Sequence, residues 1–198
     1  MKIASAFQYQ HRQWVEPRLP PLFKSLAPEH TLGGENPLAL QGLELLHVGS
    51  EVAFDHHLPA GVGLGVAAVV GLGGLAWGVA KVRSESRLDK IEGVGHLAMA
   101  ATAGMAAVSL ALGHGHHPGG LAIAAFEGVH GLTELAVGAN DIRHAHEQNK
   151  AIRAFAGAMQ IGKGAAVIAS ACLPGIAPTL HLVALGCVLA RTAAIHLE

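Results

Sequence analysis

Three ionisable residues, Glu127, His130 and Glu134, interrupt the otherwise apolar run AIAAFEGVHGLTELAVGAN at residues 122 to 140. On an α-helix, spacings of three and then four residues place all three side chains on one face. Glu-x-x-His is also the spacing with which helical bundles present a carboxylate and an imidazole to a metal ion. This pairing favours a divalent transition metal such as Zn, Fe, Mn, Co or Ni over calcium. Because helical rise separates Glu127 from Glu134 by about 10 Å, we expect an ion to pass along this stripe rather than bind all three residues at once.

Other segments contain residues of the same types. Glu44 and His47 repeat the Glu-x-x-His spacing, and Glu92 and His96 have a looser i, i+4 spacing. Histidine-rich turns can collect metal ions. The candidate ligands in such turns are His56, His57, His114, His116 and His117.

Each of these groups also has a structural interpretation. Lys163 is a candidate charge partner of the stripe, either in a structural ion pair with Glu127 or Glu134 or in a substrate-binding role. His96 alone is typical of a hydrogen-bonded core histidine. Glu44 fits equally well on the wet face of an amphipathic helix. The histidine turns fit equally well as solvated loops.

The composition favours a membrane protein. Of the 198 residues, 51% are hydrophobic and only 14% are charged. A run of about 22 residues from Leu58 has no charge and would form a helix roughly 33 Å long, which is enough to cross the hydrocarbon core of a bilayer. Similar apolar segments follow at residues 93–113, 119–139, 154–176 and 178–196. The alternative is a soluble helical tube with an apolar interior.

Charge also indicates partners and orientation. A net charge of -1 leaves no basic face for nucleic acid. The lipid bilayer is therefore the expected partner, together with further copies in a homo-oligomer or the other subunits of a membrane complex. Segments 81–90 and 140–153 are basic and residues 113–119 are not, so the positive-inside rule places the two basic loops in the cytoplasm.

A shift of 60 residues along the chain aligns several matching residues. The matched pairs include His56 with His116, Gly71 with Gly131, Leu72 with Leu132, Arg83 with Arg143, and Lys90 with Lys150. We therefore predict an all-α bundle of five to six apolar Gly/Ala-rich helices, built on a duplicated helical hairpin of about 60 residues. The predicted parts are an extended N-terminal arm (1–36), an amphipathic helix (37–57), hairpin repeat 1 (58–115), hairpin repeat 2 (116–175) and a C-terminal helix (176–198).

The repeat provides an internal comparison for the polar stripe. The residues of the first hairpin that align with Glu127, His130, Glu134 and Lys163 are Ala67, Val70, Gly74 and Ala103. The hairpin scaffold therefore does not require ionisable groups at these positions, which favours a function for them.

The sequence contains no phosphate-binding glycine loop, GxSxG elbow or HExxH motif, so we expect a protein that is not an enzyme. A di-metal oxidase would need more ligands than two Glu-x-x-His pairs provide. The leading hypothesis is a small polytopic membrane protein that binds or conducts a divalent transition-metal ion, or protons, through the Glu/His stripe. The alternative is a Gly/Ala-packed oligomeric scaffold, tube or pore, including a conduit for lipid or quinone.

Overall fold

The computed structural model describes residues 38–55, 59–112 and 121–196, and within these ranges the chain is helical, with no strand. The described α-helices are α2 (Leu38–Asp55), α3 (Ala60–Val82), α4 (Arg87–Ala111), α5 (Leu121–Glu147), α6 (Ala151–Cys172) and α7 (Ala177–His196). A short 3-10 helix, η1 (Pro174–Ile176), connects α6 to α7. The predicted all-α class is confirmed for the described residues, whereas the predicted arm at 1–36 lies outside them.

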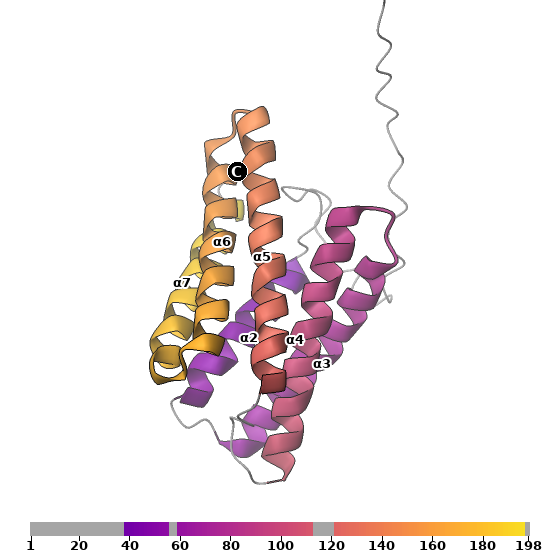
Figure 1. Cartoon of the computed structure of the whole chain (residues 1–198), viewed down its shortest axis with the longest axis vertical. Helices are drawn as coiled ribbons and strands as arrows, with labels where there is room; N and C mark the ends of the chain where they lie inside the picture. The colour runs from indigo at the N-terminus through magenta and orange to yellow at the C-terminus, as the bar shows by residue number, and fades with distance from the viewer. Residues whose placement is uncertain (1–37, 56–58, 113–120, 197–198) are drawn as a thin grey trace, which may run out of the picture.

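The helices pack as two antiparallel hairpins, α3 with α4 and α5 with α6, which meet through α4 and α5 (Figure 1). Helix α7 packs on α6. Helix α2 crosses behind α5 in the view of Figure 1 and contacts α3 on one side and α7 on the other. Side chains of α2 therefore enter the interior between the hairpins.

The turns within the two hairpins lie at the same, upper end of the bundle (Figure 1). Ser86 caps α4 by accepting a hydrogen bond from the backbone N–H of Asp89 at 3.3 Å. At the end of α5, Asn149 adopts a left-handed φ of 53°, and the N–H of Lys150 donates back to the carbonyl of Ala145 at 2.9 Å. Such a left-handed residue is a common way to end a helix.

The predicted loop at 140–153 is shorter in the structure, because α5 continues to Glu147. Likewise, α4 begins at Arg87, within the predicted loop at 81–90, and Lys81 lies in α3 with a 3% exposed side chain. The predicted loop bounds followed the end of the apolar pattern, which marks where a helix stops being buried. A helix can continue beyond that point into solvent with polar residues.

Close contacts between glycines hold each hairpin together. A Cβ atom built on Gly138 would lie 2.6 Å from the carbonyl oxygen of Gly157, and one on Gly131 would lie 2.7 Å from that of Gly164. In the first hairpin, a Cβ on Gly78 would lie 2.9 Å from the carbonyl oxygen of Gly93. Helix backbones approach this closely only where no side chain separates them.

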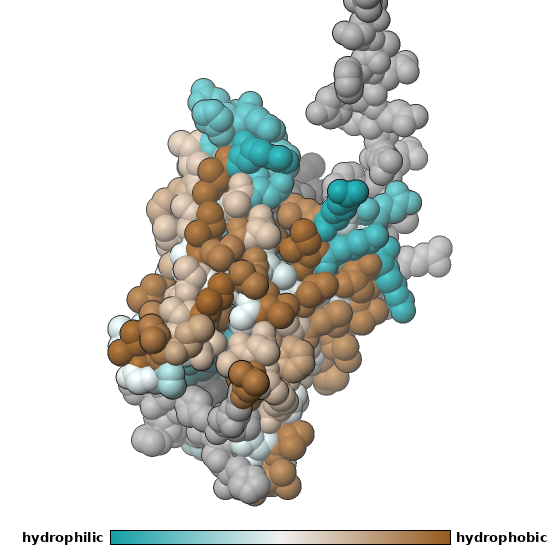
Figure 2. Space-filling view, viewed as in Figure 1, coloured by the Kyte–Doolittle hydropathy of each residue, from teal (hydrophilic) through white to brown (hydrophobic). Residues whose placement is uncertain are grey.

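Five of the helices, α3 to α7 with η1 joined to α7, are long and apolar enough to cross a membrane. Large apolar side chains are exposed along them, including Val69, Leu72, Val108 and Leu132. Figure 2 shows apolar residues over much of this face, with hydrophilic residues gathered at the turns of the upper end. This distribution is consistent with an integral membrane protein.

The structure contains both predicted hairpins, and the 60-residue duplication stays a prediction. Gly71 and Gly131 occupy matching places in the shifted sequence, and each faces the second helix of its own hairpin. A Cβ on Gly71 would lie 3.9 Å from the backbone nitrogen of Gly104, whereas Gly131 approaches Gly164 more closely. The second hairpin is therefore the more tightly packed of the two at this level.

The glycine contacts predict the effect of a single methyl group. Gly138→Ala should destabilise the protein by about 1 to 3 kcal/mol, because the added methyl meets the backbone of Gly157 rather than a flexible side chain. Gly128→Ala, on the same helix with no atom within 4 Å of the added Cβ, is the matched control. Thermal unfolding in detergent measures both variants, and equal midpoints would contradict this packing.

Candidate metal centre

Three candidate ligands from two helices converge in the interior. His47 comes from α2, and Glu127 and His130 come from α5. One ligand atom from each lies within 4.8 Å of the other two, and the residues are 3%, 6% and 1% exposed, respectively. The i, i+3 spacing brings Glu127 and His130 to one face of α5, and α2 supplies the facing imidazole. The imidazole rings of His47 and His130 have centroids 5.4 Å apart and an interplanar angle of 50°.

These ligand atoms have unused bonding capacity. Nε2 of His47, Oε1 of Glu127 and both ring nitrogens of His130 have no hydrogen-bond partner among the described residues. Buried polar atoms are nearly always hydrogen-bonded, because an unmet one costs free energy. Two imidazoles and a carboxylate that converge, each with a buried atom that lacks a partner, match the donor set of a transition-metal ion.

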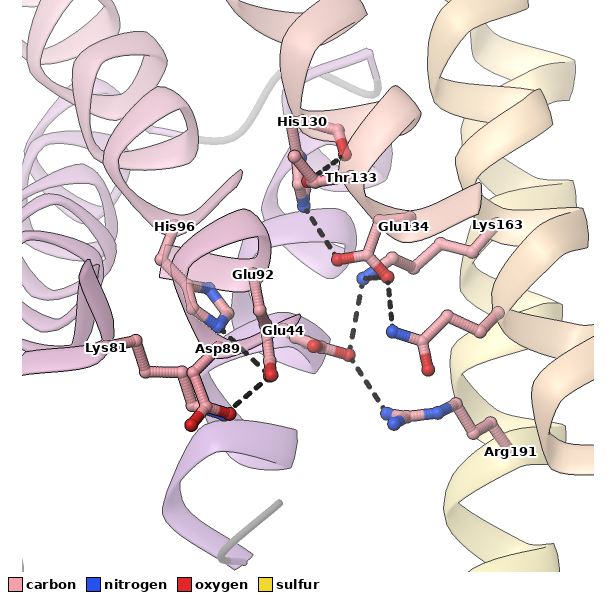
Figure 3. Close-up of polar contacts among 11 residues, drawn as sticks. Glu44, Lys81, Asp89, Glu92, His96, His130, Thr133, Glu134, Lys163 and Arg191 are labelled. Carbon is pink, nitrogen blue, oxygen red and sulfur yellow. Dashed lines mark hydrogen bonds and ion pairs between the residues drawn. The ribbon is translucent and has the colours of Figure 1, made fainter. Parts of the chain in front are cut away.

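A buried ion-pair network lies directly beside this trio (Figure 3). Lys163 of α6 extends its ammonium to Glu134 of α5 at 2.9 Å and to Glu44 of α2 at 3.3 Å. Glu44 also pairs with Arg191 of α7 at 3.5 Å. The second oxygen of Glu134 lies 3.4 Å from Nε2 of His130, so the network contacts the metal candidates through this carboxylate.

Hydrogen bonds fix the orientation of these groups. The side-chain amide of Gln160 donates to Glu134 at 2.9 Å, and the hydroxyl of Thr133 donates to the carbonyl of His130 at 2.7 Å. Such outer partners orient ligands and tune the affinity of a site.

On the other side of the trio, Glu51 lies 3.6 Å from His47 and 3.6 Å from His181 of α7. Four helices, α2, α5, α6 and α7, therefore contribute to one polar interior.

One carboxylate of this interior has no ion-pair partner among the residues that the structure describes. Glu44 and Glu134 pair with Lys163, and Glu44 also pairs with Arg191. Glu127, which is only 6% exposed, makes no such pair with a described residue. Uncompensated charge in an apolar bundle is costly, and a bound cation or a proton at Glu127 would compensate it.

His47 lies on α2, which is not among the five candidate spans. Burial is the largest cause that holds the pKa of His47 well below its usual range, followed by the charges of His130 and Lys163. A lowered pKa keeps this imidazole neutral at pH 7, and the neutral imidazole is the form that ligates metals.

The structure divides the predicted stripe into two parts. Glu127 and His130 join His47 in the trio, whereas Glu134 pairs with Lys163. Lys163 lies 2.9 Å from the stripe carboxylate Glu134, which is the geometry expected of a structural ion pair, and its role in binding stays a prediction. The alternative that placed Glu44 on a wet face is wrong, because this residue is only 3% exposed.

Two other groups of candidates lie elsewhere. Glu92 and His96 belong to a separate cluster with Lys81 between α3 and α4. His56, His57, His114, His116 and His117 lie outside the described residues.

Sequence reasoning missed the contributions of Gln160, His181 and Arg191. Arg191 had a detectable signal, since it is the only Lys or Arg in the apolar segment 178–196, and a charge in such a segment normally has a buried partner. Gln160 and His181 had no such signal, because their roles depend on how α6 and α7 pack against α5 and α2.

No protein-family model matches the chain, and no curated protein or solved structure is significantly similar to it. The described residues form an all-helical bundle with five helices that are long and apolar enough to cross a membrane and with a buried His/Glu cluster. Its function must be argued from that centre.

The ion-pair network predicts a compensating pair of substitutions. Lys163→Met should destabilise the protein by about 3 to 5 kcal/mol, because it removes the cation shared by two buried carboxylates. Adding Glu134→Gln should recover part of this loss, because it removes one of those negative charges. Arg143→Met is the matched control, since Arg143 and Glu147 form an ion pair with 68% and 59% exposed side chains, and its effect should stay within about 0.5 kcal/mol. Denaturation in detergent measures all three, and a double variant less stable than Lys163→Met would contradict the charge argument.

Proposed function

We propose that this protein is a small polytopic membrane protein that binds a divalent transition-metal ion at the metal centre (His47, Glu127 and His130) and conducts it, or protons, across the bilayer. The observation that supports it best is the convergence of His47, Glu127 and His130 from two buried helix faces: one ligand atom of each lies within 4.8 Å of the other two, and each side chain has a buried polar atom without a hydrogen-bond partner among the described residues.

The donor set supports a divalent transition-metal ion in particular. Two imidazoles and one carboxylate suit such an ion better than calcium. Glu127 has no ion-pair partner among the described residues, so a bound cation would compensate its buried charge. Protons compete with the metal for these ligands, so metal affinity should fall as pH falls.

The number of protein ligands suits exchange better than permanent binding. Three protein ligands leave at least one coordination position for water or for the next ligand, whereas structural zinc sites are closed by four. Glu134, 3.4 Å from His130, is the nearest further carboxylate and is held by Lys163. An ion that leaves the trio would meet this carboxylate next, with Lys163 setting the local charge.

The surroundings of the helices support a bilayer as partner. Five candidate spans expose apolar side chains, and the short turns of both hairpins lie at one end (Figure 1). We place this end in the cytoplasm, because Arg83, Arg87, Arg143 and Lys150 lie there. A homo-oligomer would use the exposed glycines of α3, since a Cβ on Gly61 or Gly65 would meet no atom within 4 Å.

Metal content of the purified protein tests this function. Wild-type protein loaded with Zn2+ in detergent should retain about one ion per chain after desalting. His130→Ala should weaken binding by more than the roughly 10- to 100-fold that loss of an outer hydrogen-bond partner costs, because a ligand itself is removed. Helicity should stay nearly unchanged.

His144→Ala is the matched control, because His144 lies exposed on the same helix, where its Nδ1 hydrogen-bonds with the side-chain amide of Asn140. It should bind Zn2+ as the wild type does. Equal Zn2+ retention by wild type and His130→Ala would instead favour a Gly/Ala-packed scaffold, in which the buried polar groups only hold the helices in register.

A further inference from the structure

A second buried cluster lies between α3 and α4, outside the metal centre. Nζ of Lys81 lies 2.6 Å from Oε2 of Glu92 and 3.9 Å from Oδ1 of Asp89. Oε1 of the same Glu92 lies 3.6 Å from Nε2 of His96. Figure 3 shows these four side chains grouped together. Lys81, Asp89 and His96 are 3%, 6% and 1% exposed.

This cluster repeats the arrangement found around Glu134. In both places a glutamate faces a histidine with one oxygen and a lysine of the paired helix with the other. The two glutamates lie at similar depth, because α4 and α5 touch at Gly95 and Thr133, where a Cβ on Gly95 would overlap the threonine side chain. His96 and Glu134 directly follow these two contact residues in the sequence.

The second cluster has an excess of one negative charge among the described residues. Two carboxylates face one lysine, so a single negative charge remains when His96 is neutral. Both ring nitrogens of His96 lack a hydrogen-bond partner among the described residues. Lys81 already occupies the place that a metal ion would take on Glu92. A single proton on His96 would balance the charge, whereas a divalent ion would overcompensate it.

The second cluster has a polar connection to the α3–α4 turn. The hydroxyl of Ser84, in that turn, donates to Oδ2 of Asp89 at 2.6 Å. Asp89 faces Lys81, and Lys81 faces Glu92, which faces His96. Polar groups thus follow one another from the turn into the interior.

The second cluster lies next to the helix that carries two of the candidate ligands. Among the described residues, Lys81 is the charged group of α3 that pairs with it, and α5 carries His130, Glu134 and, further along, Asp141. Helices α4 and α5 touch at Gly95 and Thr133, next to His96 and Glu134. Both clusters therefore lie in one apolar interior, where a charge gained in one acts on the other.

We propose that His96 and Glu92 form a proton-binding site whose proton is exchanged against the metal ion. The incoming proton forms an N–H bond on the ring nitrogen of His96 that faces Glu92, and it returns to water when a divalent ion enters the metal centre. Two added cations in one apolar interior repel each other, so each lowers the affinity of the other reciprocally. This exchange rests on the proposed function, whereas the proton site itself does not.

Proton counting tests the proposal in two stages. First, metal-free wild type and His96→Gln are titrated between neutral and mildly acidic pH in detergent. The wild type should take up about one proton more per chain, since glutamine cannot be protonated in this range. Second, Zn2+ is added to both proteins at mildly acidic pH and the released protons are measured. The wild type should release more protons per bound Zn2+, by an amount approaching one.

Two controls make the outcomes distinct. His144→Gln removes an exposed histidine of α5, and it should leave proton release on Zn2+ binding at the wild-type value. Glu92→Gln retains the imidazole but removes the facing carboxylate, and it should shift the His96 uptake to lower pH rather than abolish it.

Equal proton uptake by metal-free wild type and His96→Gln would overturn the proton site. Normal uptake by His96 with equal proton release on Zn2+ binding would overturn the exchange. A wild type that takes up the His96 proton but binds no Zn2+ would reject the metal function and the exchange, while supporting the proton site.

Discussion

The interior of this bundle depends on the compensation of charges buried in an apolar medium. Lys163 is 2% exposed and extends to the carboxylates of Glu44 and Glu134, which are 3% and 4% exposed. An isolated charge at that depth is prohibitive, so the positions of α2, α5 and α6 are set by the need to bring these groups together. Arg191 extends the same requirement to α7. Glu127, in the same interior, has no ion-pair partner among the described residues, and this buried carboxylate is the reason to propose that a cation binds there.

Glycines permit this arrangement by bringing the backbones close. Gly131 directly follows His130, and Gly164 directly follows Lys163, and these two glycines form the close contact between α5 and α6. The closest approach of the hairpin therefore lies beside the centre, where it limits how far Lys163 and Glu134 can separate. Small residues that pack helices and buried ionisable residues thus alternate along the same two helices.

Much of the fold could be predicted from the sequence, because run length and composition report directly on apolar helices. The five candidate spans and α2 all occur near their predicted positions, and only their polar ends differ. Within one helix, the spacing of Glu127 and His130 was sufficient to place them together. The rule that a charge at membrane depth needs a partner indicated Glu127 or Glu134 as the partner of Lys163, and packing selects Glu134.

Contacts between helices could not be predicted in the same way. The sequence separates His47 from His130 by more than two helices, and no periodicity indicates that α2 crosses behind α5. Glu134 is not part of the trio, because its carboxylate pairs with Lys163. This pairing depends on the side-chain rotamer of Glu134 and on which helix packs beside it. Only packing showed that Glu92 and His96 form a cluster of their own with Lys81.

The most direct test of the central claim is X-ray absorption spectroscopy of the purified protein loaded with one equivalent of Co2+. Coordination by His47, Glu127 and His130 predicts first-shell nitrogen and oxygen with the outer-shell scattering of two imidazoles. His130→Ala should lose one of these imidazoles. A spectrum with water oxygens alone, or an imidazole contribution that persists unchanged in His130→Ala, would contradict the existence of a metal centre at this site.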